Sequence, residues 1–221
     1  MHRSEGGHID CNAIGNNRYI CRGFKNIRNA EALDNKEHMI SFGKDWSGKV
    51  IKSDAFAGNI NNGSIPSISN RFADIHIHTD QSPPSSGDIY GFIDEVIIDS
   101  NYIRYVATPN GLMYALILTN KQSAINFNLK YPRRPGITVQ NADGSSIKYQ
   151  PTFPQILVDE FDQIKGWGGA SKELATAFLL AKYNTGVALL KEDDDGSFRR
   201  LITKETKDRN GNKIYTAYNC E

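Results

Sequence analysis

The chain has 221 residues, of which 39% are hydrophobic and 23% are charged, and its 26 Lys and Arg nearly balance its 25 Asp and Glu. This composition is typical of a globular protein with a real core and argues against a disordered chain. A net charge of +1 lacks the basic excess of a general nucleic-acid binder. Because no run of 18 apolar residues occurs, we expect no membrane-spanning segment and no membrane partner.

Up to about residue 150 the apolar periodicity predicts alternating strands and helices. In chain order these are a helix (23–35), a strand hairpin (36–43 with 49–56), a single strand (72–79), a helix (87–99), a second hairpin (101–119) and a helix (120–130). The first helix is expected to bury Phe24, Ile27 and Leu33. Ser85 or Ser86 is a suitable N-cap for the helix over 87–99.

The last third of the chain changes character. It predicts two amphipathic helices (154–167 and 170–184), a hairpin with an acidic turn (185–205), and a final turn and strand (208–219). We therefore predict an α/β fold in which a central mixed β-sheet is flanked by helices. Its expected parts are an irregular N-terminal segment, a core and a C-terminal helix-plus-hairpin extension, over residues 1–22, 23–150 and 151–221.

Two charged segments favour ordinary structural roles. The Pro-rich segment 130–136 is interpreted as an extended linker in preference to a basic binding loop. The acidic segment 192–196 lacks the spacing of a calcium-binding loop and predicts a solvated hairpin turn. Trp46 and Trp167 are interpreted as aromatics of the core or its rim.

The three cysteines are Cys11, Cys21 and Cys220, and none belongs to a Cys-x-x-Cys pair. This spacing excludes a cysteine zinc site and a thioredoxin-like motif. Cys11 and Cys21 can close a small loop outside a reducing cytosol, but free thiols are favoured because disulfides are uncommon in cytosolic proteins. The polar N-terminus lacks the apolar region of a signal peptide, which leaves a cytoplasmic protein and a part of a larger exported protein both open.

The most informative residues are His76, His78 and Asp88. The two histidines are two apart on a predicted strand, so both side chains leave the same face and can bind one divalent metal ion. The Pro-rich turn that follows is long enough to bring the Asp88 carboxylate back beside the strand end. Two His and one Asp leave a fourth tetrahedral position for water, as in catalytic zinc sites. The alternative is an accidental match to a short motif.

Other metal-enzyme families with a His-x-His start fit the chain poorly. Residues 74–79, DIHIHT, resemble the first strand of polymerase-and-histidinol-phosphatase phosphoesterases, but no His follows His78 to complete that site. Amidohydrolase barrels fail for the same reason, and 221 residues is short for them. Zinc nucleoside deaminases need His-x-Glu and Cys-x-x-Cys, and this chain has neither.

Residues 36–119 resemble the JAMM (JAB/MPN) metalloprotease family. The order is similar throughout: Glu37 leads an apolar strand hairpin, His76 and His78 form the His-x-His pair, and Ser85 and Asp88 fit Ser-x-x-Asp before a helix. The gap between His78 and Ser85 holds six residues where the family usually has seven. Ile77 and Thr79 also depart from the usual residues. These departures indicate a divergent member of the bacterial branch, which includes RadC-like proteins and JAB-like toxin domains.

The resemblance implies a JAB/MPN-like layering of sheet and helices. It also implies a Zn²⁺ ion bound by His76, His78, Asp88 and a water, and the ion lowers the pKa of that water to about 7. Glu37 is then the general acid–base, and Ser85, or Ser86 in its place, donates a hydrogen bond to the oxyanion. From the residues alone, a solvated strand-edge carboxylate is the favoured interpretation of Glu37, because exposed carboxylates are the rule, and Ser85 can serve only as a helix N-cap. Glu31 competes with Glu37, but it lies in a predicted helix.

The function expected from this resemblance is zinc-dependent hydrolysis of a peptide or isopeptide bond in a peptide or protein substrate. The rivals are a catalytically inactive JAMM-like scaffold that only binds partners and, less well supported, a metal phosphoesterase. An isopeptide bond to a ubiquitin-like protein, a linear peptide and self-cleavage from a parent chain all remain open as the cleaved bond. The sequence does not give the oligomeric state.

Overall fold

The structure is a computed structural model, and it describes residues 18–60, 63–136, 138–140, 146–148, 152–166 and 169–218. Within these residues the protein is an α/β protein with five helices, a mixed eight-stranded sheet and a separate C-terminal two-stranded hairpin. The described residues form two compact units. The first unit lies within Met1–Pro83, Asn101–Ile117 and Leu190–Arg200, and the second within Pro84–Ser100, Leu118–Leu189 and Leu201–Glu221.

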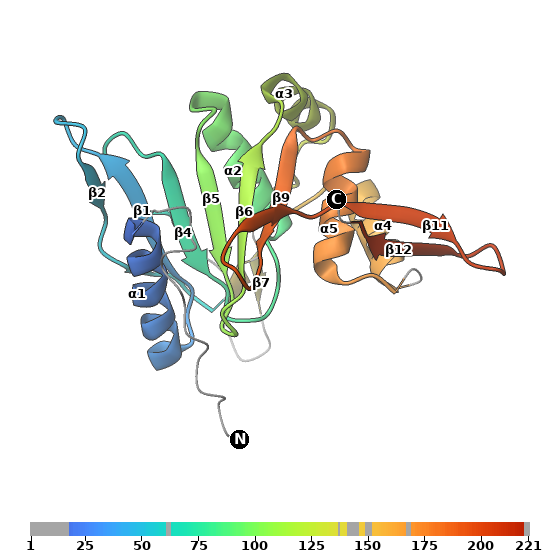
Figure 1. Cartoon of the computed structure of the whole chain (residues 1–221), viewed down its shortest axis with the longest axis horizontal. Coiled ribbons are helices and arrows are strands. Elements are labelled where there is room, and N and C mark those ends of the chain that lie inside the picture. Colours follow the sequence, from blue (N-terminus) through green and yellow to red (C-terminus); the bar gives the residue numbers. More distant parts are fainter. Residues whose placement is uncertain are drawn as a thin grey trace. The chain divides into compact units, whose positions relative to one another are not determined.

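The main sheet confirms the predicted central mixed sheet. Its strands are β1 (His38–Lys44), β2 (Val50–Lys52), β3 (Phe56–Ala57), β4 (Ala73–Ile77), β5 (Ile103–Ala107), β6 (Met113–Leu118), β9 (Val187–Glu192) and β10 (Phe198–Arg200). They follow the order β10-β9-β6-β5-β4-β1-β2, and β3 also pairs with β1 (Figure 1). β4 and β5 are parallel, whereas β1–β2, β1–β4, β5–β6 and β9–β10 are antiparallel. The two hairpins predicted over 36–56 and 101–119 are therefore present.

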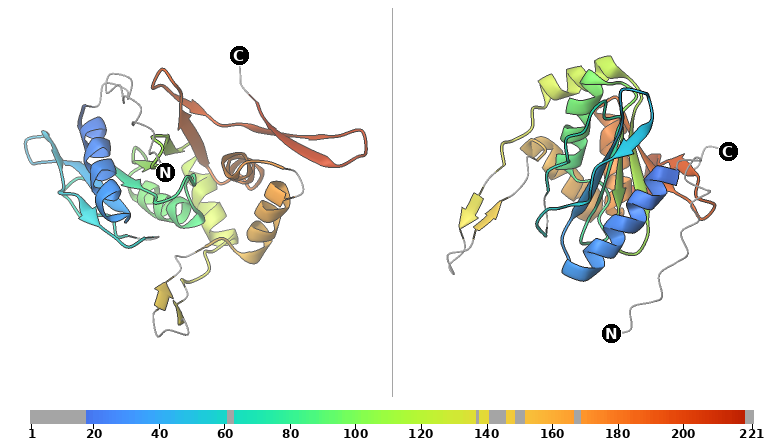
Figure 2. Two further views of the ribbon diagram at one scale, coloured as in Figure 1. Left: turned by 90° about the horizontal axis from the view of Figure 1, so that it is seen from below. Right: turned by 90° about the vertical axis from the view of Figure 1, so that its left-hand side faces the viewer.

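The core of the first unit lies under helix α1 (Arg18–Asp34), which contacts β1 and β4 (Figure 2). The helix begins five residues before the predicted start, because Ile20 and Cys21 extend its apolar stripe. The stripe continues through Phe24 and Ile27, as expected. Leu33 is 89% exposed, so its predicted burial is wrong. Six residues after Ile27, Leu33 has turned about 120° away from the buried face of the helix.

The buried Cys21 is disulfide-bonded, so the preference for a free thiol is wrong at this position. The preference relied on the rarity of disulfides in cytosolic proteins, and that rule depends on the compartment of the protein. Cys11 and Cys220 lie outside the described residues.

Strand β4 presents different chemistry on its two faces. Every residue of β4 is buried, since β1 and β5 flank it on both sides. Ile75 and Ile77 point into the apolar cluster that includes the α1 side chains. Because side chains alternate along a strand, Asp74 and His76 point to the opposite face. The sheet therefore separates the apolar cluster under α1 from the face that carries Asp74 and the two histidines.

The second unit contains the other four helices and two small hairpins. Its elements are α2 (Ser86–Ile98), α3 (Lys121–Lys130), β7 (Thr138–Gln140), β8 (Ser146–Lys148), α4 (Gln155–Gly166), α5 (Lys172–Lys182), β11 (Thr203–Lys207) and β12 (Lys213–Ala217). Helix α2 contacts α3, α4 contacts α5, and α5 contacts both strands of the β11–β12 ribbon (Figure 2). Phe178 of α5 meets Tyr215 of β12 edge-on, with ring centroids 4.9 Å apart. All four helices were predicted, and for α2, α4 and α5 the prediction rested on their apolar spacing.

The predicted C-terminal extension differs from the structure in one respect. Strands β9 and β10 form the expected hairpin with an acidic turn, but they join the main sheet beside β6. In the described part of this extension, β11 and β12 form a separate hairpin outside that sheet. The apolar run of Val187, Ala188 and Leu189 is fully buried, which is typical of a strand that is covered on both faces.

The remaining segments have structural roles. Arg133 forms an ion pair with Asp94 at 2.8 Å, and the Arg134 guanidinium donates to the Phe153 carbonyl at 2.9 Å. These contacts support the linker interpretation of segment 130–136. Trp46 is 97% exposed in the turn between β1 and β2, so its interpretation as an aromatic of the core or its rim is wrong. Trp167 lies outside the described residues. Among the described helices, none is both long and apolar enough to cross a membrane.

Candidate metal centre

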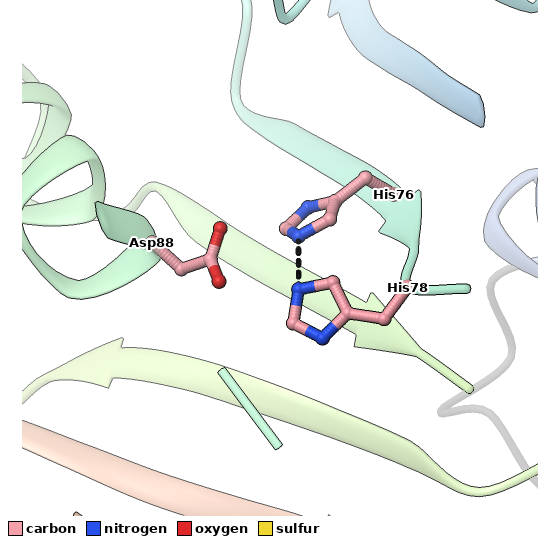
Figure 3. Close-up of side chains that lie close together, drawn as sticks. All are labelled: His76, His78 and Asp88. Atoms are coloured by element: carbon pink, nitrogen blue, oxygen red, sulfur yellow. Dashed lines mark hydrogen bonds between the residues drawn. The ribbon is translucent and has the colours of Figure 1, made fainter. Parts of the chain in front are cut away.

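Two histidines converge at the end of β4. His76 is 4% exposed and His78 is 8% exposed. His78 follows the last residue of β4, but its backbone N–H donates to the Ala107 carbonyl at 3.0 Å and continues the pairing with β5. Both side chains therefore leave the same face of the sheet. Their Nε2 atoms lie 3.2 Å apart, with one ring directed at the other (Figure 3).

The tautomer of His78 follows from its second contact. Its Nδ1 lies 3.0 Å from the Ser82 carbonyl oxygen. A carbonyl oxygen only accepts hydrogen bonds, so Nδ1 carries the proton and donates it. In the neutral ring the proton is then absent from Nε2, whose lone pair is directed toward His76. A histidine that donates one ring N–H to a backbone carbonyl and offers the other nitrogen is typical of metal ligands.

Asp88 is held in place by the start of helix α2. Ser85 is the N-cap, and its hydroxyl oxygen accepts from the Asp88 backbone N–H at 3.2 Å. In return the Oδ2 atom of Asp88 accepts from the Ser85 backbone N–H and from the Ser85 hydroxyl, each at 2.7 Å. This reciprocal arrangement is a capping box, and it fixes the carboxylate in the first turn of the helix. The N-cap role predicted for Ser85 is confirmed.

The three side chains form one group. One ligand atom from each of His76, His78 and Asp88 lies within 4.8 Å of the other two, and the Asp88 carboxylate points toward the two rings (Figure 3). Two nitrogens bound to one tetrahedral zinc at about 2.05 Å stand roughly 3.3 Å apart, close to the observed separation of the two Nε2 atoms. The donor set of two imidazoles and one carboxylate thus fits a divalent metal ion such as zinc.

The strand pairing also brings the predicted base, Glu37, toward this face. Glu37 is half-buried and is the residue directly before the first residue of β1, His38. In the β1–β4 register His38 is opposite Ile77 and Met39 is opposite His76. One further step of this antiparallel register sets Glu37 opposite His78, and directly opposed residues share a face. Its role as a base remains a prediction.

The competing carboxylate, Glu31, lies on α1, as the sequence predicted. It is buried, and it falls one helical turn after Ile27 on the stripe that faces the apolar cluster. Helix α1 covers the face of the sheet that carries Ile75 and Ile77, which is the face opposite the histidines. Its position therefore favours Glu37 over Glu31.

Asp74, the first residue of the DIHIHT motif, belongs to a buried ion pair. It is fully buried opposite Arg104 in the β4–β5 register, and it accepts from Arg104 Nη2 at 2.8 Å and from the Tyr102 hydroxyl. Burial and the Asp74 charge raise the pKa of Tyr102, so the phenol remains a donor. Because Arg104 and Tyr102 both bind the Asp74 carboxylate, its role is structural. This further weakens the phosphoesterase interpretation.

The sequence reasoning missed Ser82 and the residue that holds it, Asp80. The carbonyl of Ser82 orients His78, and the Asp80 carboxylate accepts from the backbone and side chain of Ser82. An Asp two residues before a Ser in a Pro-rich loop is a recognisable signal of an Asx turn.

No protein-family model matches the chain, and no curated protein matches it at a significant level of similarity. The case for a function therefore depends on these residues and their geometry.

Ser85→Ala tests what the serine contributes. As an N-cap it should cost about 1 kcal/mol of stability on removal, because the Asp88 backbone N–H loses its acceptor. As an oxyanion donor it should instead lower turnover by about 10²–10³-fold. Thermal unfolding and steady-state kinetics on the same variant distinguish the two roles. Ser86→Ala, one residue further into α2, is the matched control and should change neither quantity appreciably.

Proposed function

We propose that this protein is a zinc-dependent hydrolase that cleaves a peptide or isopeptide bond, as a divergent JAMM-like enzyme. The observation that carries the proposal is the convergence of His76, His78 and Asp88 within 4.8 Å. Two of these side chains come from one strand and the third from the helix that follows it, in the order of the JAMM-like pattern. The β1–β4 pairing, which if extended by one residue sets Glu37 opposite His78, adds support from a residue far away in the sequence.

The metal ligands and Glu37 have distinct tasks in this proposal. His76, His78 and Asp88 would hold the ion. Zinc, when bound, supplies a water activated for attack at neutral pH, because it lowers the pKa of that water to about 7. Glu37 would accept a proton during the attack and deliver it to the leaving amine.

Ser85 must change its hydrogen-bond partner during the proposed reaction. Its hydroxyl donates to Asp88 Oδ2 at 2.7 Å. To donate to the oxyanion that develops on the substrate carbonyl, the hydroxyl must turn away from Asp88. The backbone N–H of Ser85 would continue to hold the carboxylate through its own 2.7 Å hydrogen bond. Asp88 would then stay in position while the serine changes partner.

Hydrolysis assays with controlled metal content test this function. A panel of linear peptides and of isopeptide-linked ubiquitin-like conjugates should include a substrate that the purified protein cleaves. Chelation should abolish the cleavage, and stoichiometric zinc should restore it. A protein that binds zinc but cleaves no member of the panel would favour the scaffold interpretation.

A further inference from the structure

The loop after β4 is organised around one carboxylate. Asp80 is exposed, and its Oδ1 accepts from the Ser82 backbone N–H at 2.9 Å while its Oδ2 accepts from the Ser82 hydroxyl at 2.7 Å. Both oxygens of the carboxylate therefore hold the same residue. This is an Asx turn with an added side-chain hydrogen bond, and it fixes the backbone at Ser82.

The fixed backbone in turn holds a metal ligand. The Ser82 carbonyl accepts from His78 Nδ1 at 3.0 Å, so the three contacts join Asp80, Ser82 and His78 within five residues of chain. Neighbouring residues secure the same loop. The Thr79 hydroxyl donates to the Ile60 carbonyl at 2.8 Å, and the Asn110 backbone N–H donates to Gln81 Oε1 at 3.4 Å.

We infer that Asp80 is a positioning residue that holds His78 as the Nδ1–H tautomer, with the Nε2 lone pair presented for metal binding. The inference rests on the proposed metal function for its consequence, but the tautomer itself is a property of the metal-free protein. With the turn intact, the Ser82 carbonyl stabilises a proton on Nδ1. Without the turn the carbonyl is free to move, and both neutral tautomers become populated. Only one of them has a lone pair on Nε2.

The chain offers a matched control for this turn. Asp45, in the turn between β1 and β2, accepts from the Ser47 backbone N–H at 2.9 Å and from the Ser47 hydroxyl at 2.7 Å. The two donors and the two distances match those of Asp80 with Ser82, but at Asp45 a single oxygen, Oδ1, accepts both hydrogen bonds. Asp45→Ala therefore removes an equivalent pair of hydrogen bonds, and a third from the Lys49 backbone N–H at 3.0 Å, from the exposed turn of the β1–β2 hairpin. Any effect of Asp80→Ala that Asp45→Ala lacks is specific to the loop that carries His78.

Two measurements test the inference. Long-range ¹H–¹⁵N NMR of the metal-free protein at about pH 8, where an ordinary imidazole is neutral, reports which nitrogen of His78 carries the proton. Wild type and Asp45→Ala should show the proton on Nδ1, whereas Asp80→Ala should show a mixture of tautomers. The zinc dissociation constant should rise by about 10–100-fold in Asp80→Ala and stay unchanged in Asp45→Ala. The zinc stoichiometry of both variants should stay at one per chain.

Asp80→Asn keeps an oxygen that accepts from the Ser82 backbone N–H but loses the second carboxylate oxygen. Asp80→Asn should give values between those of wild type and Asp80→Ala in both measurements. If Asp80→Ala fails to fold, Asp80→Asn alone tests the inference. A His78 proton that stays on Nδ1, together with a zinc dissociation constant within about twofold of wild type in both Asp80 variants, would overturn the inference. A wild-type protein that binds no zinc would contradict the proposed function, while the NMR measurement would still decide the role of Asp80.

Discussion

His76→Ala and Asp88→Ala are each expected to abolish stoichiometric zinc binding. Each change removes one of the three protein ligands that lie within 4.8 Å of one another, and the two that remain cannot complete a site with three protein ligands. Elemental analysis of the purified variants and calorimetric titration of the metal-free proteins measure the effect. Asp88→Asn serves as a second variant at the helix start, because its amide oxygen can still accept from Ser85.

Matched controls separate loss of a ligand from loss of fold. His38 is also a buried histidine of this sheet, but it lies opposite Ile77 on the α1 face and its Nε2 donates to Asp34 at 2.9 Å. Asp94 is on the same helix as Asp88 and pairs with Arg133. His38→Ala and Asp94→Ala should keep one zinc per chain. Undiminished zinc in His76→Ala or in Asp88→Ala would refute the site.

Glu37→Gln is expected to retain zinc and the fold but to lose hydrolysis by about 10²–10⁴-fold, the usual contribution of a general acid–base. Glutamine keeps the size and much of the hydrogen bonding of the glutamate but cannot accept the proton. The β1–β4 register ends at His38 opposite Ile77, and its extension by one residue sets Glu37 opposite His78, outside the ligand group. Steady-state kinetics, zinc content and thermal unfolding are measured on the same preparation.

Glu31→Gln is the matched control for Glu37→Gln. Glu31 lies on α1, on the other face of the sheet, and its substitution should leave the turnover of the folded protein close to wild type. A Glu37→Gln variant with wild-type turnover would remove the base from the proposed mechanism. The scaffold interpretation would gain if neither variant nor wild type hydrolysed any substrate although zinc was bound.

Local rules account for most of the candidate site. The i, i+2 spacing of His76 and His78 requires only that residues 72–79 form a strand, and β4 confirms this. The Ser85–Asp88 spacing requires only a helix start, which the capping box provides. The position of Glu37 depended on a long-range pairing of strands, and the β1–β4 register confirms the pairing but not the role.

The features that the sequence did not predict are contacts set by long-range packing and one local turn. The β9–β10 hairpin was recognisable from its turn, but its neighbour in the sheet, β6, is set by tertiary contacts that no local pattern encodes. The buried pair of Asp74 and Arg104 likewise depends on the parallel alignment of β4 with β5. In contrast, the Asp80–Ser82 turn is local, and attention to Asx turns would have found it.

The metal content of the purified wild-type protein is the most direct test of the central claim, which is that His76, His78 and Asp88 form a metal centre. The protein should be produced with zinc available, purified without chelators and analysed for all divalent metals. We predict about one zinc per chain, which survives extensive dialysis and is absent from His76→Ala prepared in parallel. A folded wild-type protein that carries no metal, and takes up none on titration with zinc, would contradict the account.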